Sequence, residues 1–267
     1  MPTNEEVSAL IKSAVKKSII DFAKKSLKKK PKFQILDLLI PRERKIRSIV
    51  GGLETSLGTT LWEPLAKALA ANNGFEVRNA DLESPVNMPA NLSNVLANII
   101  ADRNAGGRQY TAIKSHNAIK EVCQTFLHSP ITSFEKAPNG SGVDIWLVKD
   151  DVNYFFDVKT VQPNLSALKS CMKQVLTWYA YFYARYPTEL AQSKIVFPYN
   201  PKPEKSFWDV VIGGGKPLEK DDEAWVGNQF WDFCSGVENT FEIIQNSFVE
   251  LRESRTLESE LRRLLNR

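Results

Sequence analysis

The spacing of apolar residues predicts several helices, the first of them long. Residues 5–30 place apolar side chains three and four positions apart, opposite a lysine-rich face, which is typical of an amphipathic helix that Pro31 ends. Gly51-Gly52 is expected to end a second helix. Further helices are predicted from the same spacing, so that the predicted set is 5–30, 42–50, 60–71, 92–100, 165–186 and 237–264.

The centre of the chain changes to β-prone runs. Val143–Val148 and Asn153–Val161 are separated by Lys149-Asp150-Asp151, which predicts a hairpin, and residues 81–91 are predicted to form a loop. Further strands are predicted at 75–80, 195–199 and 208–212. The predicted elements follow one another as helices, a hairpin, a helix, a strand and more helices. This order indicates a mixed α/β fold around one central sheet.

Composition excludes several classes of protein. The chain has 267 residues, of which 43% are hydrophobic and 25% charged, so disorder of the whole chain, a collagen-like structure and a disulfide scaffold are excluded. The three cysteines, Cys123, Cys171 and Cys234, cannot all pair within one chain and fit a reducing compartment. No apolar run reaches membrane-spanning length, and the first residues lack the pattern of a signal peptide. We therefore expect a cytoplasmic protein with no membrane partner.

The net charge of +4 conceals a strongly basic N-terminal segment. Between Lys12 and Arg47 there are 13 basic residues and three acidic ones, which gives that segment a charge of about +10. One interpretation is that these lysines contact the phosphates of a nucleic acid. The other is that they form a solvated helix face followed by a charged linker. The lysines concerned are Lys24, Lys25, Lys28, Lys29, Lys30 and Lys32.

Each strand of the predicted hairpin carries a carboxylate between apolar residues. If the chain turns through a two-residue loop at Asp150-Asp151, Asp144 lies directly opposite Asp157 on one face of the hairpin. Lys159, two residues further on, points to the same face. Two carboxylates placed directly opposite each other repel unless a cation lies between them. Carboxylate oxygens are hard ligands that favour Mg²⁺.

This arrangement resembles the PD-(D/E)XK nuclease superfamily, the fold of many type II restriction endonucleases. The residues that carry the resemblance are Asp144 and, after a twelve-residue spacing, Asp157-Val158-Lys159, although Gly142-Val143 stands where the proline of the motif would be. The resemblance implies an α/β restriction-endonuclease-like core, in which a central mixed β-sheet is flanked by helices, with extra N- and C-terminal helices.

The same resemblance implies the roles of individual residues. Asp144 and Asp157 would bind Mg²⁺ with help from the carbonyl of Val158, and Lys159 would assist the attacking water. Glu63 would complete the site from an earlier helix, with Glu54 as a second candidate. The alternative for Glu63 is a capping box, Thr60-x-x-Glu63, that begins its helix.

The implied activity is Mg²⁺-dependent hydrolysis of phosphodiester bonds in double-stranded DNA at specific sequences, by a homodimer that operates beside a cognate DNA methyltransferase. The segment 51–63 also resembles restriction enzymes that cut GGNCC-type sites. A DNA repair or junction-resolving nuclease of the same fold, or a DNA-binding protein without catalysis, is the alternative. We expect one nuclease domain over 1–267, with a basic helical part at 1–50, a catalytic core at 58–200 and a C-terminal part at 201–267.

Two polar segments are candidates for contact with bases, because their side chains combine the donors and acceptors that base edges require. Ordinary polar loops are the alternative for each residue. The candidates are Arg103, Asn104, Arg108, Gln109, Lys114, Asn200 and Lys202.

Overall fold

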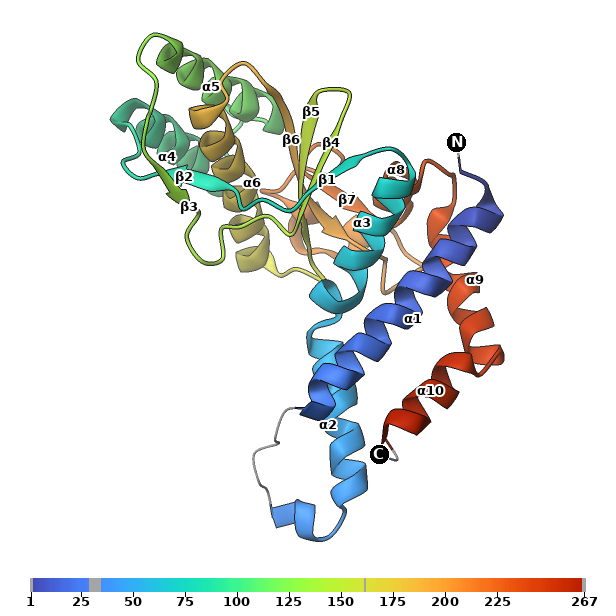
Figure 1. Ribbon diagram of the computed structural model, residues 1–267. Helices are drawn as coiled ribbons and strands as arrows, with labels where there is room; N and C mark the ends of the chain where they lie inside the picture. The colour runs from blue at the N-terminus through green and yellow to red at the C-terminus, as the bar shows by residue number, and fades with distance from the viewer. Residues whose placement is uncertain (1, 29–34, 161, 266–267) are drawn as a thin grey trace. The chain divides into compact units, whose positions relative to one another are not determined.

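The computed structural model describes residues 2–28, 35–160 and 162–265, which fall into two compact units (Figure 1). Unit 1 comprises Met1–Asn73 and Trp231–Arg267, and unit 2 comprises Gly74–Phe230. The organisation of 1–267 as a single domain stays a prediction. Within the described ranges, no helix is both long enough and apolar enough to cross a bilayer.

Unit 1 is helical. The side chains of Val7, Ile11 and Val15 are buried on one face of its first helix, as the predicted amphipathic pattern requires. This helix packs against the other helices of the unit, including the two that form the predicted closing region. The helices are α1 (Asn4–Lys28), α2 (Pro41–Thr55), α3 (Glu63–Asn72), α9 (Thr240–Glu253) and α10 (Thr256–Leu265), with a 3₁₀ turn at Ile35–Leu38 and a π-helical turn at Gly58–Trp62.

The prediction that Gly51-Gly52 ends a helix is wrong, because α2 continues through both glycines to Thr55. Gly52 faces Phe22 of α1: a Cβ on Gly52 would lie 3.2 Å from Cζ of that ring. The small residue therefore permits a close approach of two helices and does not provide a break in the chain.

Unit 2 contains a five-stranded mixed sheet within the described ranges, in the order β1-β4-β5-β6-β7. The pairs β1/β4 and β4/β5 are antiparallel, and β5/β6 and β6/β7 are parallel. A two-stranded sheet and four helices accompany it, and α8 (Asn228–Ser235) follows at the boundary between the units. The strands are β1 (Glu76–Arg78), β2 (Glu83–Pro85), β3 (Phe134–Lys136), β4 (Ile145–Lys149), β5 (Val152–Val158), β6 (Leu190–Phe197) and β7 (Ala224–Val226), and the helices are α4 (Ala90–Asn104), α5 (Ala112–Gln124), α6 (Leu165–Arg185) and α7 (Phe207–Val210).

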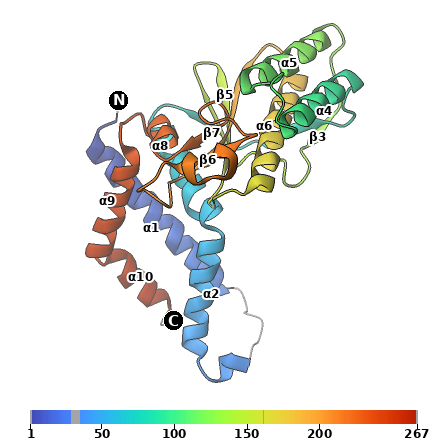
Figure 2. The ribbon, with the colours of Figure 1, turned by 180° about the vertical axis from the view of Figure 1, so that it is seen from behind.

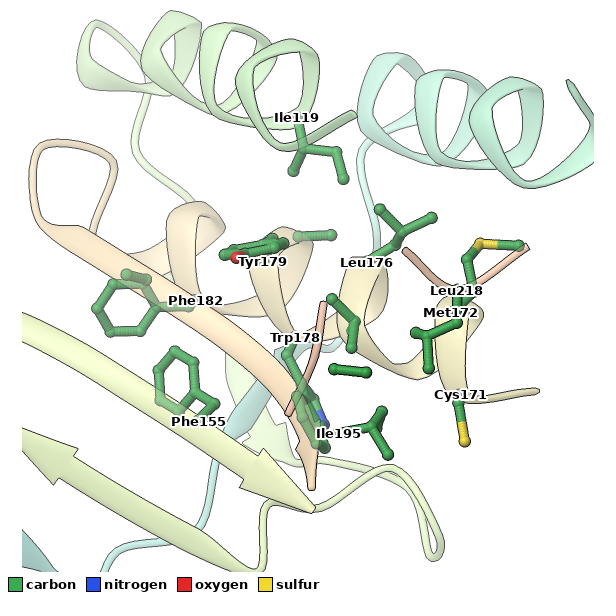
Figure 3. Close-up of a cluster of buried hydrophobic side chains, with 14 of the residues drawn as sticks. Ile119, Phe155, Cys171, Met172, Leu176, Trp178, Tyr179, Phe182, Ile195 and Leu218 are labelled. Atoms are coloured by element: carbon green, nitrogen blue, oxygen red, sulfur yellow. The ribbon is translucent and has the colours of Figure 1, made fainter. Parts of the chain in front are cut away.

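Helix α6 connects β5 to the parallel strand β6 and lies with α4 and α5 in one helical layer (Figures 1 and 2). Its buried residues, among them Met172 and Leu176, meet Phe155 of β5 and Ile195 of β6 in the core of the unit, and α5 contributes Ile119 (Figure 3). The predicted mixed sheet flanked by helices is therefore observed. The core fixes α6 over the face of the sheet to which the odd-numbered residues of β5 point.

Two predictions for unit 2 are wrong. Residues 208–212 do not form a strand: Phe207–Val210 is one turn of helix, and Gly213 and Gly214 follow with positive φ angles of 65° and 63°. Residues 81–91 do not form only a loop, since Glu83–Pro85 pairs with Phe134–Lys136.

Candidate active site

The hairpin of β4 and β5 has the predicted register. Lys149 pairs with Val152 and Ile145 pairs with Phe156. Asp150 and Asp151 form the two-residue turn with φ angles of 50° and 60°, as the turns that match the twist of paired strands require.

This register brings the two candidate carboxylates to the end of the hairpin. Asp144 and Asp157 occupy the next position beyond the Ile145–Phe156 pair, and the backbone N–H of Asp144 donates to the carbonyl of Phe156 over 3.0 Å. The Oδ2 atom of Asp144 accepts a hydrogen bond of 2.9 Å from the backbone N–H of Val158. The Asp144 side chain therefore reaches across to the strand that carries Asp157.

Asp157 is buried, with 6% of its surface exposed. Its Oδ1 atom accepts a hydrogen bond of 3.0 Å from Nε2 of Gln174, which α6 places over this face of the sheet. Its Oδ2 atom lies 2.6 Å from Nζ of Lys159, which forms an ion pair with it. The ammonium group of Lys159 is therefore the counter-ion of this buried carboxylate.

Lys159 follows β5 and is partly exposed, and its backbone N–H donates to the carbonyl of Val196 over 2.8 Å. Burial lowers the pKa of its ammonium group, but the Asp157 carboxylate, with a smaller contribution from Asp144, outweighs burial and raises the pKa above its usual value. The side chain is therefore a cation at neutral pH.

The two carboxylates are suitable ligands for a hard divalent cation, but they form only part of a ligand set. Asp144 and Asp157 offer carboxylate oxygens, which are the ligands that Mg²⁺ prefers. Among the described residues, no group of three or more His, Cys, Asp and Glu side chains is arranged to hold a metal ion. Backbone, water and substrate oxygens commonly complete Mg²⁺ sites.

A family model of HinfI, described as a type II restriction endonuclease, matches residues 3–251. The chain belongs to the HinfI family of type II restriction endonucleases. The match covers the hairpin, α6 and nearly all of the chain, and it makes the protein a DNA-cleaving hydrolase. No curated protein and no solved structure matches the chain.

The HinfI family match confirms the predicted identification as a type II restriction endonuclease. It names no recognition sequence, so the resemblance of residues 51–63 to enzymes that cut GGNCC-type sites stays a prediction. The residue roles stay predictions as well, because the match assigns none.

Glu63 and Glu54 belong to unit 1, whereas Asp144, Asp157 and Lys159 belong to unit 2. Glu63 is the first residue of α3 and is half-buried, and Glu54 is exposed near the end of α2. Which of them completes the site stays a prediction.

The capping-box alternative for Glu63 is wrong. The chain is already helical before Glu63, and the residue before it, Trp62, makes no side-chain cap. The backbone N–H of Thr60 donates to the carbonyl of Ser56, and the hydroxyl groups of these two residues lie 2.9 Å apart. The Thr60 hydroxyl thus pairs within the preceding turn.

Arg103 does not fit the predicted contact with bases. Its side chain is buried at the end of α4, where both terminal nitrogens donate to the carboxylate of Glu223 over 2.5 Å and one also donates to the carbonyl of Pro217 over 2.7 Å. A guanidinium held in this way is structural, so we exclude Arg103 from the candidates for DNA contact.

The other candidates lie on the surface of unit 2. Asn104, Arg108, Gln109, Lys114 and Lys202 are exposed. Asn200 is half-buried and uses both ends of its amide within its own loop, donating to the carbonyl of Lys205 and accepting from the N–H of Lys202. Its amide therefore shapes that loop. The DNA contacts of these residues stay predictions.

Proposed function

We propose that this protein is an Mg²⁺-dependent endonuclease that cuts double-stranded DNA at a specific sequence, with its reaction centre at Asp144, Asp157 and Lys159 of a restriction-endonuclease-like core. One observation carries the proposal. In a chain of the HinfI family, the hairpin register sets two carboxylates opposite each other, with a lysine cation 2.6 Å from one of them.

Asp144 and Asp157 would hold the cation, and the carbonyl of Val158 would add a ligand. A bound Mg²⁺ would supply Lewis-acid activation of water and neutralise charge at the scissile phosphate. The two carboxylates are already oriented by hydrogen bonds: Val158 donates to Asp144, and Gln174 donates to Asp157. Glu63, or alternatively Glu54, would supply a third carboxylate.

Lys159 acts in this proposal as a hydrogen-bond donor and a positive charge. The Asp157 carboxylate raises the pKa of this ammonium group, which is therefore a cation at neutral pH. It would orient the attacking water and stabilise the negative charge that develops on the phosphate.

The wider proposal concerns assembly and context. Cutting both strands of a symmetric site requires two reaction centres related by a two-fold axis, which supports a homodimer. A restriction enzyme also requires a cognate methyltransferase that protects the host DNA. Its substrate and its three free cysteines support a cytoplasmic location. DNA contacts by Asn104, Arg108, Gln109, Lys114, Asn200 and Lys202 belong to the proposal.

The test is digestion of phage DNA by the wild-type protein and by Asp157→Asn, with Mg²⁺ and with EDTA. The control is Asp151→Asn, which changes the same chemical group in the same hairpin at a turn position where asparagine is favoured. Discrete fragments that require Mg²⁺, are made by the control and are not made by Asp157→Asn support the proposal. Nicks or a smear would favour the repair or junction-resolving alternative, and DNA binding without cleavage would favour the non-catalytic one.

A further inference from the structure

The positive charge of the protein is concentrated in the unit that does not contain Asp144 and Asp157. Unit 2 contains 16 Lys and Arg residues and 17 Asp and Glu residues, a net charge of −1. In unit 1, residues 1–73 contain 14 basic and 7 acidic residues, and residues 231–267 contain 5 and 7, a net charge of +5. A polyanionic substrate is therefore attracted mainly by the N-terminal part of unit 1.

Ion pairs sort the lysines of α1 into two groups. Lys12 pairs with Glu250 over 2.6 Å and Lys16 pairs with Glu260 over 2.5 Å, so carboxylates of α9 and α10 neutralise these two charges. Lys17 and Lys28 are exposed and have no carboxylate partner among the described residues. These two lysines are therefore available to an external anion.

The available lysines form a stripe along the helix. Lys17, Lys24 and Lys28 are 7 and 4 residues apart, a spacing that places them on one face of α1, and Lys25 lies beside them. From Lys17 to Lys28 the stripe is about 16 Å long, close to half a helical turn of B-DNA. Lys24 has only a loose contact of 4.0 Å with Asp21 in this stripe.

Helix α2 adds further positive charge to the same unit. It lies beside α1 (Figures 1 and 2) and packs against it through the contact of Gly52 with Phe22. Lys45 and Arg47 of this helix are exposed. We call the four exposed lysines of this part of α1 the basic surface: Lys17, Lys24, Lys25 and Lys28.

We propose that the basic surface binds the phosphate backbone of duplex DNA independently of its sequence. The inference rests on the proposed function, because it takes DNA as the substrate, and it adds where and how unit 1 holds that substrate. The negative charge of duplex DNA is complementary to this surface. Contact of the basic surface with the same surface of a second chain would instead place like charges against each other. This contact supplies affinity, and sequence discrimination is left to residues elsewhere in the protein.

The experiment compares two double variants that each remove two positive charges from α1. Lys17→Gln/Lys28→Gln removes two members of the basic surface, and Lys12→Gln/Lys16→Gln removes the two lysines that carboxylates already neutralise. Binding to a short duplex of arbitrary sequence is measured in EDTA by fluorescence anisotropy, over salt concentrations from about 50 to 200 mM. Circular dichroism confirms that each variant is folded.

The expected result is a change in the salt dependence of binding for one variant alone. With Lys17→Gln/Lys28→Gln, the slope of log K against log salt becomes less negative by about 2, and binding weakens by about tenfold or more at low salt. With Lys12→Gln/Lys16→Gln, slope and affinity stay close to those of the wild type. The inference would be overturned if the slope of log K against log salt were the same for the wild type and both variants. It would also be overturned if both variants lost the same amount of DNA affinity.

Failure of this inference is distinguishable from failure of the proposed function. If the wild-type protein cuts DNA with Mg²⁺ and both variants bind DNA as the wild type does, the basic surface has no part in binding and the nuclease proposal stands. If the wild-type protein neither binds nor cuts duplex DNA, both proposals fail.

Discussion

Replacing Arg103 by Met is expected to destabilise unit 2 strongly, although the substitution removes no catalytic group. In the structure, the guanidinium donates two hydrogen bonds of 2.5 Å to Glu223, which is only 2% exposed. It also donates to the carbonyl of Pro217 and so ties the end of α4 to the segment that leads into β7. Methionine fills much of the same space but offers no donor.

The size of the effect follows from the carboxylate left behind. Burial raises the pKa of Glu223, and the hydrogen bonds and charge of Arg103 oppose that shift. Without Arg103, the buried carboxylate retains the N–H of Glu219 as a donor but has lost its counter-ion. Breaking a buried pair in this way costs about 3–5 kcal/mol, whereas replacing both partners by apolar residues is often close to neutral. Arg103→Met/Glu223→Leu is therefore expected to recover more than half of the loss.

Urea unfolding followed by circular dichroism measures the effect. For a slope of about 2 kcal/mol per molar urea, the midpoint of the transition falls by roughly 1.5–2.5 M in Arg103→Met and returns most of the way in the double variant. A fall below about 0.5 M, or a double variant less stable than Arg103→Met, would refute the structural role of this pair. Such a result would return Arg103 to the candidates for DNA contact.

Three further outcomes are expected. Gln174→Ala removes the hydrogen bond that orients Asp157. In steady-state cleavage assays it is expected to lower kcat by about tenfold and to leave KM unchanged. A raised KM with unchanged kcat would contradict this positioning role. Burial, with a smaller effect of a nearby lysine, lowers the pKa of His116 from 6.5 to about 4. Because the unfolded chain then binds more protons than the folded protein between these values, the free energy of unfolding falls as the pH drops from 6.5 towards 4, by up to about 1.4 kcal/mol per pH unit. His116→Gln should remove this pH dependence in urea titrations. Gly215→Ala is expected to lower the melting temperature by several degrees, because its φ angle is 93° and a Cβ would lie 2.5 Å from the ring of Trp208; an unchanged melting temperature would contradict that clash.

The candidate site could be predicted from the sequence because its geometry is set locally. A two-residue turn at Asp150-Asp151 fixes the register of the hairpin, and the alternation of side chains then decides which residues share a face. The partner of Asp157 on α6 could not be found in this way, because Gln174 approaches through the packing of a helix on the sheet and no residue spacing encodes that approach.

Elements that depend on distant contacts were predicted less well. Residues 208–212 are apolar enough for a strand, but the glycines after them adopt positive φ angles and Trp208 packs at Gly215. Gly51-Gly52 is a helix break by its local propensity, but packing against Phe22 keeps the helix intact. Helix α5 and strands β2, β3 and β7 were not predicted, and the three strands are only three residues long.

The role of Asp144 and Asp157 as metal ligands is tested most directly by a titration with Mn²⁺, a spectroscopic substitute for Mg²⁺, followed by electron paramagnetic resonance. Asp144→Asn/Asp157→Asn removes the two carboxylates of the candidate site, and Asp150→Asn/Asp151→Asn removes two carboxylates from the turn of the same hairpin. We expect the wild-type protein and the turn variant to bind the ion alike and the site variant not to bind it. Equal binding by the site variant and the wild type would contradict the claim that Asp144 and Asp157 hold the metal.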